Sequence, residues 1–178
     1  RAKDLARFFQ QAADESFPLH PEEEQLRAIL LANGILELRD GGYSPGEGAV
    51  ISISRSSGPL LRHHLLTHEA FHGVFFSSEA YRRSSLALWE ELGEGEREFW
   101  LLFFRWVGYD TEDTYLAANE LQAYLFQQER RGVGPYFRGV TAGRLLASYP
   151  ERRAAILGFL GADPGSFERR FDALERSL

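Results

Sequence analysis

Two histidines and a glutamate in this chain have the spacing of residues that bind and use a metal ion. His68 and His72 frame the five-residue sequence His-Glu-Ala-Phe-His. Residues four apart on a helix lie one turn above each other on one face, so both imidazoles can bind one tetrahedral Zn²⁺ ion. Glu69 lies about 100° further round such a helix, beside the metal rather than among these ligands. That position suits a general base that takes a proton from water activated by the metal.

The surroundings of these histidines on the predicted helix, about Leu60 to Phe76, favour a metal over simple packing. On a helical wheel, His64, His68 and His72 share an arc with apolar side chains, namely Leu61, Leu65, Phe71 and Phe75. Histidines in an apolar stripe are costly to bury unless a partner satisfies their nitrogens. A metal ion does so, and hydrogen bonds to carbonyl groups are the alternative. His64, one turn before His68, is a candidate supporting residue or extra ligand.

A mononuclear catalytic zinc site also needs a third protein ligand and an open position. Glu120 is the main candidate, because it falls mid-helix on a face formed by small and apolar residues, namely Leu116, Ala117, Ala123 and Tyr124. None of the positions three or four residues away is Lys or Arg, so no intrahelical ion pair satisfies this carboxylate. Two alternatives stay open. Glu120 can pair with a distant arginine, or Glu79 can be the third ligand, although Ser77 and Ser78 are expected to break the helix before it.

Together, His68-Glu69-x-x-His72 and the downstream sequence Asn-Glu-x-x-Ala-Tyr at residues 119–124 resemble the gluzincin branch of the zincin metallopeptidases, the thermolysin-like superfamily. The resemblance implies that His68, His72 and Glu120 bind one zinc ion per chain. It also implies that Glu69 is the catalytic base. The expected activity is zinc-dependent hydrolysis of peptide bonds in a peptide or protein substrate.

The resemblance covers about residues 49–130 and implies further parts of an active site. In that family an edge strand before the HExxH helix borders the cleft and aligns an extended peptide, and residues 49–54 are predicted to form it. The family has an acid where this chain has Tyr124. The Tyr124 phenol can orient an imidazole by hydrogen bonding, and Asn119 or Asp113 can contribute.

The resemblance also implies a histidine or tyrosine toward the C-terminus that stabilises the oxyanion. No histidine follows His72. Tyr136 is therefore predicted to supply this group, with Tyr115 and Arg138 as alternatives. Tyr136 lies in the glycine-rich segment 132–139, which is predicted to be a loop, and a packed aromatic ring is its alternative role.

The elements that must position these residues indicate an α+β protein, mostly α. We expect a minimal zincin-like domain with a small β-sheet preceding the HExxH helix. The alternating residues 49–54 and the apolar run 35–38 are the predicted strands. The predicted helices cover residues 2–15, 22–33, 60–76, 79–91, 94–107 and, after an N-cap at Asp110 or Thr111, up to about 131, with two or three shorter helices to the end.

Composition narrows the class of protein. The 178 residues predict a single domain over 1–178, with 44% hydrophobic and 26% charged residues. A net charge of −6 argues against nonspecific nucleic-acid binding, no apolar run is long enough for a membrane span, and the absence of cysteine excludes thiolate ligands. Because the chain starts at Arg1 and has no methionine, we expect a trimmed piece of a longer protein, for which export or membrane anchoring is open.

Three functions are consistent with the sequence. The first is the zinc-dependent peptidase. The second is a catalytically silent zincin-like domain that binds metal or peptide, which the short chain and the missing oxyanion histidine favour. The third is a helical interaction module in which the HExxH sequence is a coincidence. Metal content separates the third from the other two, and cleavage of unstructured substrates separates the first from the second.

Overall fold

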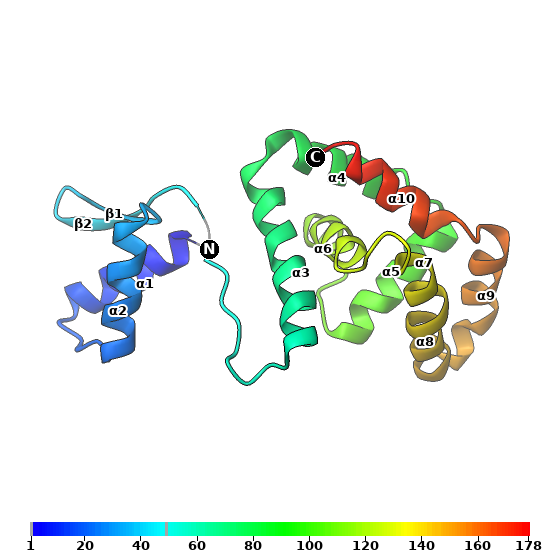
Figure 1. Ribbon diagram of the computed structural model, residues 1–178, viewed down its shortest axis with the longest axis horizontal. Helices are drawn as coiled ribbons and strands as arrows, with labels where there is room; N and C mark the ends of the chain where they lie inside the picture. Colours follow the sequence, from blue (N-terminus) through cyan, green and yellow to red (C-terminus); the bar gives the residue numbers. More distant parts are fainter. Residues whose placement is uncertain (1, 49) are drawn as a thin grey trace. The chain divides into compact units, whose positions relative to one another are not determined.

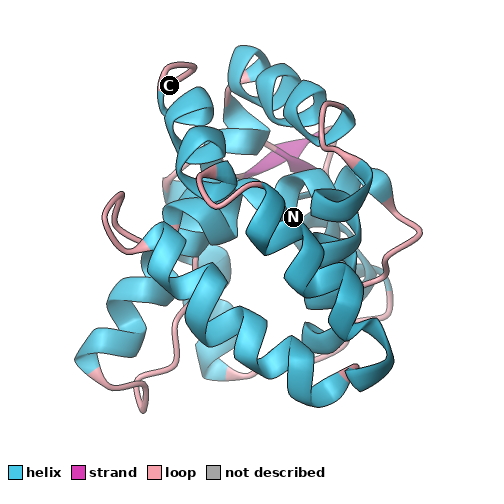
Figure 2. Ribbon diagram, turned by 90° about the vertical axis from the view of Figure 1, so that its right-hand side faces the viewer, coloured by secondary structure: helices cyan, strands magenta, loops and turns pink. Residues whose placement is uncertain are grey.

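The computed structural model describes residues 2–48 and 50–178. Contacts within the chain divide it into two compact units, one up to Ser52 and one from Ile53 to Leu178, whereas the length predicted a single domain. Each unit has its own hydrophobic core. The fold is α+β and mostly α, as the sequence predicted, with one pair of strands among many helices (Figures 1 and 2).

The first unit contains helices α1 (Ala2–Asp14) and α2 (Pro21–Ala32) and the antiparallel strands β1 (Leu36–Arg39) and β2 (Gly42–Pro45). Asp40 and Gly41 join the strands and both have positive φ angles, 52° and 80°. Two left-handed residues in a two-residue loop match the twist of paired strands, so this turn fixes the hairpin. The small core of this unit consists of Ala6, Phe9, Leu30 and Leu36.

The prediction of a strand at residues 49–54 is wrong for residues 50–54, which have no strand structure, while Ala49 lies outside the described residues. In the described sheet, β2 is the only partner of β1. Val50 and Ile51 are 43% and 41% exposed, so the alternation of apolar and polar residues buries no face. A strand needs partners for its backbone groups, and alternation alone supplies none. The edge strand that the resemblance implies is therefore absent from residues 50–54.

The regular elements in the described part of the second unit are all helices. Its elements are α3 (Pro59–Ser77), α4 (Glu79–Glu90), α5 (Glu94–Val107), α6 (Thr114–Phe126), α7 (Val133–Pro135), the π-helix η1 (Tyr136–Thr141), α8 (Ala142–Ser148), the 3₁₀-helix η2 (Pro150–Arg152), α9 (Arg153–Ala162) and α10 (Ser166–Glu175). None of the helices in the described part of the chain is long and apolar enough to cross a membrane.

Helix α6 lies inside this second unit. It packs against α3, α4, α5 and α10, and Figure 1 shows it between α3 and α5. The aromatic helix α5 was predicted at the bounds observed and supplies much of the core, together with rings from other helices, among them Phe75, Tyr81, Trp89, Phe137 and Phe167. Because neighbours surround α6, polar residues near its middle are removed from water, which sets the conditions for Glu120.

Helix ends position the residues of interest. Helix α3 ends at Ser77 as predicted, and the Ser78 hydroxyl accepts a hydrogen bond from the Tyr81 N–H at the start of α4. For helix α6, the predicted N-cap at Asp110 or Thr111 is wrong. Asp113 is the N-cap of α6, and its carboxylate accepts from the Leu116 N–H at 2.9 Å.

The prediction that residues 132–139 form a loop is also wrong. Residues 133–139 make up α7 and most of the π-helix η1. Val133 and Phe137 are fully buried in the aromatic core. Glycine in a helix costs about 1 kcal/mol per residue relative to alanine. The free energy gained by burying these large apolar side chains outweighs that cost.

Candidate metal centre

The structure brings together the three residues that the sequence predicted as metal ligands. Helix α3 places His68 and His72 one turn apart, and α6 places Glu120 opposite them. The Glu120 carboxylate has Oε2 at 3.4 Å from His68 Nε2 and Oε1 at 3.5 Å from His72 Nε2, and the two Nε2 atoms are 3.0 Å apart. One ligand atom from each residue lies within 4.8 Å of the other two, as in a group able to hold one ion.

The neighbours of Glu120 remove the alternatives that the sequence left open. The Glu120 side chain is buried, and within the described part of the chain its ion-pair partners are the two histidines and no arginine or lysine. Glu79, the rival ligand, is exposed in the first turn of α4 and forms an ion pair with Arg83 at 2.7 Å. Of the two candidates for a third ligand, Glu120 is therefore the one that lies beside the two histidines.

The chemistry of the group fits a divalent cation. Glu120 Oε2 and His68 Nδ1 are buried and make no hydrogen bond with any residue that the structure describes. An unsatisfied buried polar atom costs about 1–3 kcal/mol, and more if it is charged. Two imidazole nitrogens with one carboxylate oxygen are a frequent donor set of catalytic zinc. An ion bound by the three residues would give the Glu120 carboxylate a positively charged partner.

Glu69, the predicted base, lies next to His68 on α3 and is half-buried. Its charge is one of the smaller contributions that raise the pKa of Tyr124, after burial and other neighbouring groups. The Tyr124 ring packs edge-on against the His68 ring with centroids 4.6 Å apart. Among the described residues Glu69 has no ion-pair partner, so its carboxylate is available as a proton acceptor beside the group.

The predicted supporting residues differ in what they do. Asn119 Oδ1 is 3.0 Å from His72 Nδ1, the contact expected of a residue that orients a ligand imidazole. Tyr124 contacts His68 through its ring, whereas the sequence suggested a hydrogen bond to an imidazole. Asp113 caps α6 instead of reaching a histidine. The His64 ring lies next to the ring of His63, with their centroids 6.0 Å apart, and His64 is not part of the three-residue group.

The candidates for an oxyanion-stabilising group are spread out. Tyr136 begins the π-helix, packs against Phe137 at 5.1 Å, and contributes to raising the pKa of Tyr124. No hydrogen bond joins its hydroxyl to another described residue. Tyr115 packs against Phe75, and Arg138 holds Glu168 through hydrogen bonds of 2.7 and 2.9 Å, so both are engaged elsewhere.

Tyr109 is a residue near the group that the sequence did not single out. It follows Gly108, whose φ of 103° turns the chain sharply at the end of α5. Burial is the main cause that raises the pKa of Tyr109, and the neighbouring Tyr124 and the charge of Glu120 raise it further. Its phenol therefore stays protonated beside the Glu120 carboxylate. The only sequence signal was a tyrosine in the break between two helices, which indicates no direction for the side chain.

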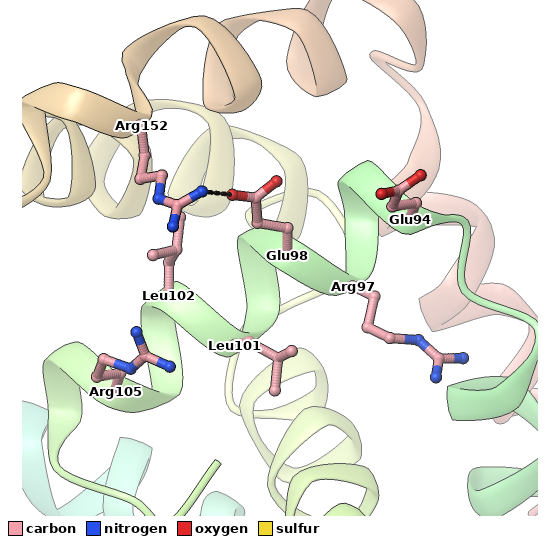
Figure 3. Close-up of a pocket in the computed structure, with 7 residues that line it drawn as sticks. All are labelled: Glu94, Arg97, Glu98, Leu101, Leu102, Arg105 and Arg152. Atoms are coloured by element: carbon pink, nitrogen blue, oxygen red, sulfur yellow. Dashed lines mark hydrogen bonds and ion pairs between the residues drawn. The ribbon is translucent and has the colours of Figure 1, made fainter. Parts of the chain in front are cut away.

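A separate groove of about 420 Å³ lies along α5 and η2, away from the three ligands (Figure 3). Its polar lining consists of Glu94, Arg97, Glu98, Arg105 and Arg152, and the Arg152 guanidinium donates to Glu98 at 3.3 Å. Two leucines complete the lining. None of the three candidate metal ligands lines this groove, so it does not extend the metal centre.

No family model, curated protein or solved structure matches this chain.

Proposed function

We propose that this chain is a zinc-dependent peptidase in which His68, His72 and Glu120 hold one zinc ion. The observation that carries the proposal is the meeting of two imidazole Nε2 atoms and a buried carboxylate that lacks a cationic residue. A buried carboxylate needs a cation or a proton, and this donor set belongs to the chemistry of zinc. The sequence order of the HExxH helix followed by a helix with the glutamate adds the peptidase class.

Each nearby side chain has a role in this proposal. His68, His72 and Glu120 would hold the zinc ion, which would supply Lewis acidity toward a carbonyl group and would lower the pKa of water at the site to about 7. The Glu69 carboxylate would take a proton from the water whose oxygen attacks the carbonyl carbon, and would pass that proton to the amine nitrogen as the C–N bond breaks. Asn119 orients His72, and the Tyr124 ring holds the plane of His68. Tyr136 is proposed as the oxyanion donor, and Tyr109 is a second phenol close to the ligands.

The test is cleavage of a panel of unstructured peptides by zinc-loaded protein, with Glu69→Gln beside the parent. We expect the parent to cleave and Glu69→Gln to keep its zinc while losing about 10²–10⁴-fold in rate, the usual contribution of a general base. Equal cleavage by the two purified proteins would contradict the role of Glu69. Glu47→Gln, an exposed substitution in the first unit, is a control for the chemical change.

A second candidate function is a zincin-like domain that binds zinc without hydrolysis. One observation favours it: residues 50–54 form no edge strand for a peptide. Zinc bound at full stoichiometry with no cleavage of any peptide in the panel would support this candidate over the peptidase.

A further inference from the structure

A chain of buried hydrogen bonds runs from α4 through α6 to one of the candidate ligands. The Tyr81 hydroxyl donates to Gln122 Oε1 at 3.0 Å, Gln122 Nε2 donates to Asn119 Oδ1 at 3.2 Å, and Asn119 Oδ1 is 3.0 Å from His72 Nδ1. Tyr81 and Gln122 are fully buried. This series of hydrogen bonds therefore links three helices without the participation of bulk water.

The orientation of the Gln122 amide follows from its neighbours. Its Nε2 also lies 2.8 Å from the Asn119 backbone carbonyl and 3.3 Å from that of Phe71. Backbone carbonyls only accept hydrogen bonds, so the nitrogen of the amide must face them and the oxygen must face Tyr81. Burial raises the pKa of Tyr81, so its hydroxyl keeps the proton that it donates to this oxygen.

The orientation of Gln122 in turn fixes Asn119 and His72. The two hydrogens of Gln122 Nε2 serve the two backbone carbonyls and Asn119 Oδ1, so one hydrogen is shared between two acceptors. Asn119 must still present its oxygen, because its NH₂ group would face another NH₂ group at 3.2 Å. The same oxygen is next to His72 Nδ1, which must then carry the proton of the neutral ring. His72 Nε2 is left with its lone pair, and this is the atom that faces His68 and Glu120.

We propose that Gln122 and Tyr81 are positioning residues that hold Asn119 with its oxygen toward His72, and so fix the Nδ1–H tautomer that leaves Nε2 free to bind a cation. The use of that lone pair for zinc rests on the proposed function, whereas the tautomer is a property of the metal-free protein. Three buried polar side chains linked in series, where apolar residues would pack as well, indicate a role beyond packing.

The experiment is long-range ¹H–¹⁵N NMR of the histidine rings in the metal-free protein, at a pH well above the ordinary histidine pKa. We expect one Nδ1–H tautomer for His72 in the parent. Gln122→Met removes the donor at nearly constant size and should give a mixture of tautomers. Tyr81→Phe, which removes only a hydroxyl, should shift the same signals less and keeps the test open if Gln122→Met does not fold. Tyr149 is partly buried and takes no part in this series of hydrogen bonds, so Tyr149→Phe should leave the His72 signals unchanged.

A second readout is zinc affinity by competition with a chromophoric chelator. Loss of a direct partner of a ligand histidine typically lowers metal affinity 10–100-fold, and we expect the lower end of that range for Gln122→Met, because Gln122 acts on His72 through Asn119. An Nε2–H tautomer in the parent, or an unchanged tautomer in both variants, would overturn the proposal. If the parent shows the Nδ1–H tautomer and the variants lose it while no protein binds zinc, the positioning role stands and the proposed function fails.

Discussion

Two buried glutamates in the second unit, Glu96 and Glu120, differ in the groups that neutralise their carboxylates. Glu96 is 4% exposed, receives hydrogen bonds from the Arg170 guanidinium at 2.9 and 3.2 Å, and accepts another from the Ser166 hydroxyl. Glu120 is 5% exposed and faces two histidines, and its Oε2 has no hydrogen bond to a described residue. Both carboxylates need a positive partner, but of the two only Glu96 has an arginine partner among the described residues. Glu96 is therefore neutralised within the fold, whereas Glu120 lacks such a partner, as the proposed metal site requires.

The largest expected difference is the response of the two sites to zinc. At a zinc concentration of 1,000 times Kd, binding to the folded protein alone stabilises it by about 4 kcal/mol. We expect the parent to show this gain as a rise in thermal unfolding temperature and Glu120→Gln to lose most of it. The same gain in both proteins would contradict the assignment of Glu120 as a ligand. Glu96→Gln, if it folds, should keep the zinc response.

The second prediction removes the internal partner of Glu96. Arg170→Met leaves a buried carboxylate without its cation, which costs about 3 kcal/mol, the lower end of the range because Arg170 is partly exposed. Urea unfolding measures the loss. Zinc affinity should stay unchanged, since Arg170 has no contact with the three ligands. A loss of zinc binding in a folded Arg170→Met protein would show that the two sites are not independent.

The third prediction concerns Glu120 in the metal-free protein. Replacing an unsatisfied buried carboxylate by a neutral amide removes a desolvated charge, so Glu120→Gln should change the free energy of unfolding by less than about 1 kcal/mol, or increase it. Urea unfolding in the presence of a chelator measures this. A loss as large as that of Arg170→Met would show that Glu120 is already satisfied within the chain.

The smallest effect is expected at a partly exposed pair, Arg138 and Glu168. The Arg138 guanidinium lowers the pKa of Glu168 below its ordinary value. A carboxyl with a lowered folded pKa adds stability above its unfolded pKa and loses that contribution as the pH falls through the lowered folded value. Glu168→Gln should therefore flatten the acid limb of stability against pH by at most about 1 kcal/mol, as expected for a solvent-screened pair. A steeper acid limb in the variant would contradict this sign.

The candidate ligands were predictable because local rules decide them. The four-residue spacing puts His68 and His72 on one helix face, and the absence of Lys or Arg one turn from Glu120 marked it as a carboxylate without a local partner. The break at Ser77 and Ser78 was equally local, since a hydroxyl there caps the next helix.

The remaining features depend on packing between distant segments. Tyr81 and Gln122 meet only because α4 and α6 pack together, and Tyr109 reaches Glu120 only through the turn at Gly108. The alternation at residues 49–54 predicted a strand, but it carries no information about a pairing partner. At residues 132–139, composition predicted a loop where burial of the core rings produces a helix.

The proposed function depends on one metal ion bound by His68, His72 and Glu120. Elemental analysis after zinc reconstitution and dialysis measures this binding, with the parent and Glu120→Gln side by side. We expect about one zinc per parent chain and a marked loss in the variant. No zinc in the parent, or equal zinc in both proteins, would contradict the proposed site.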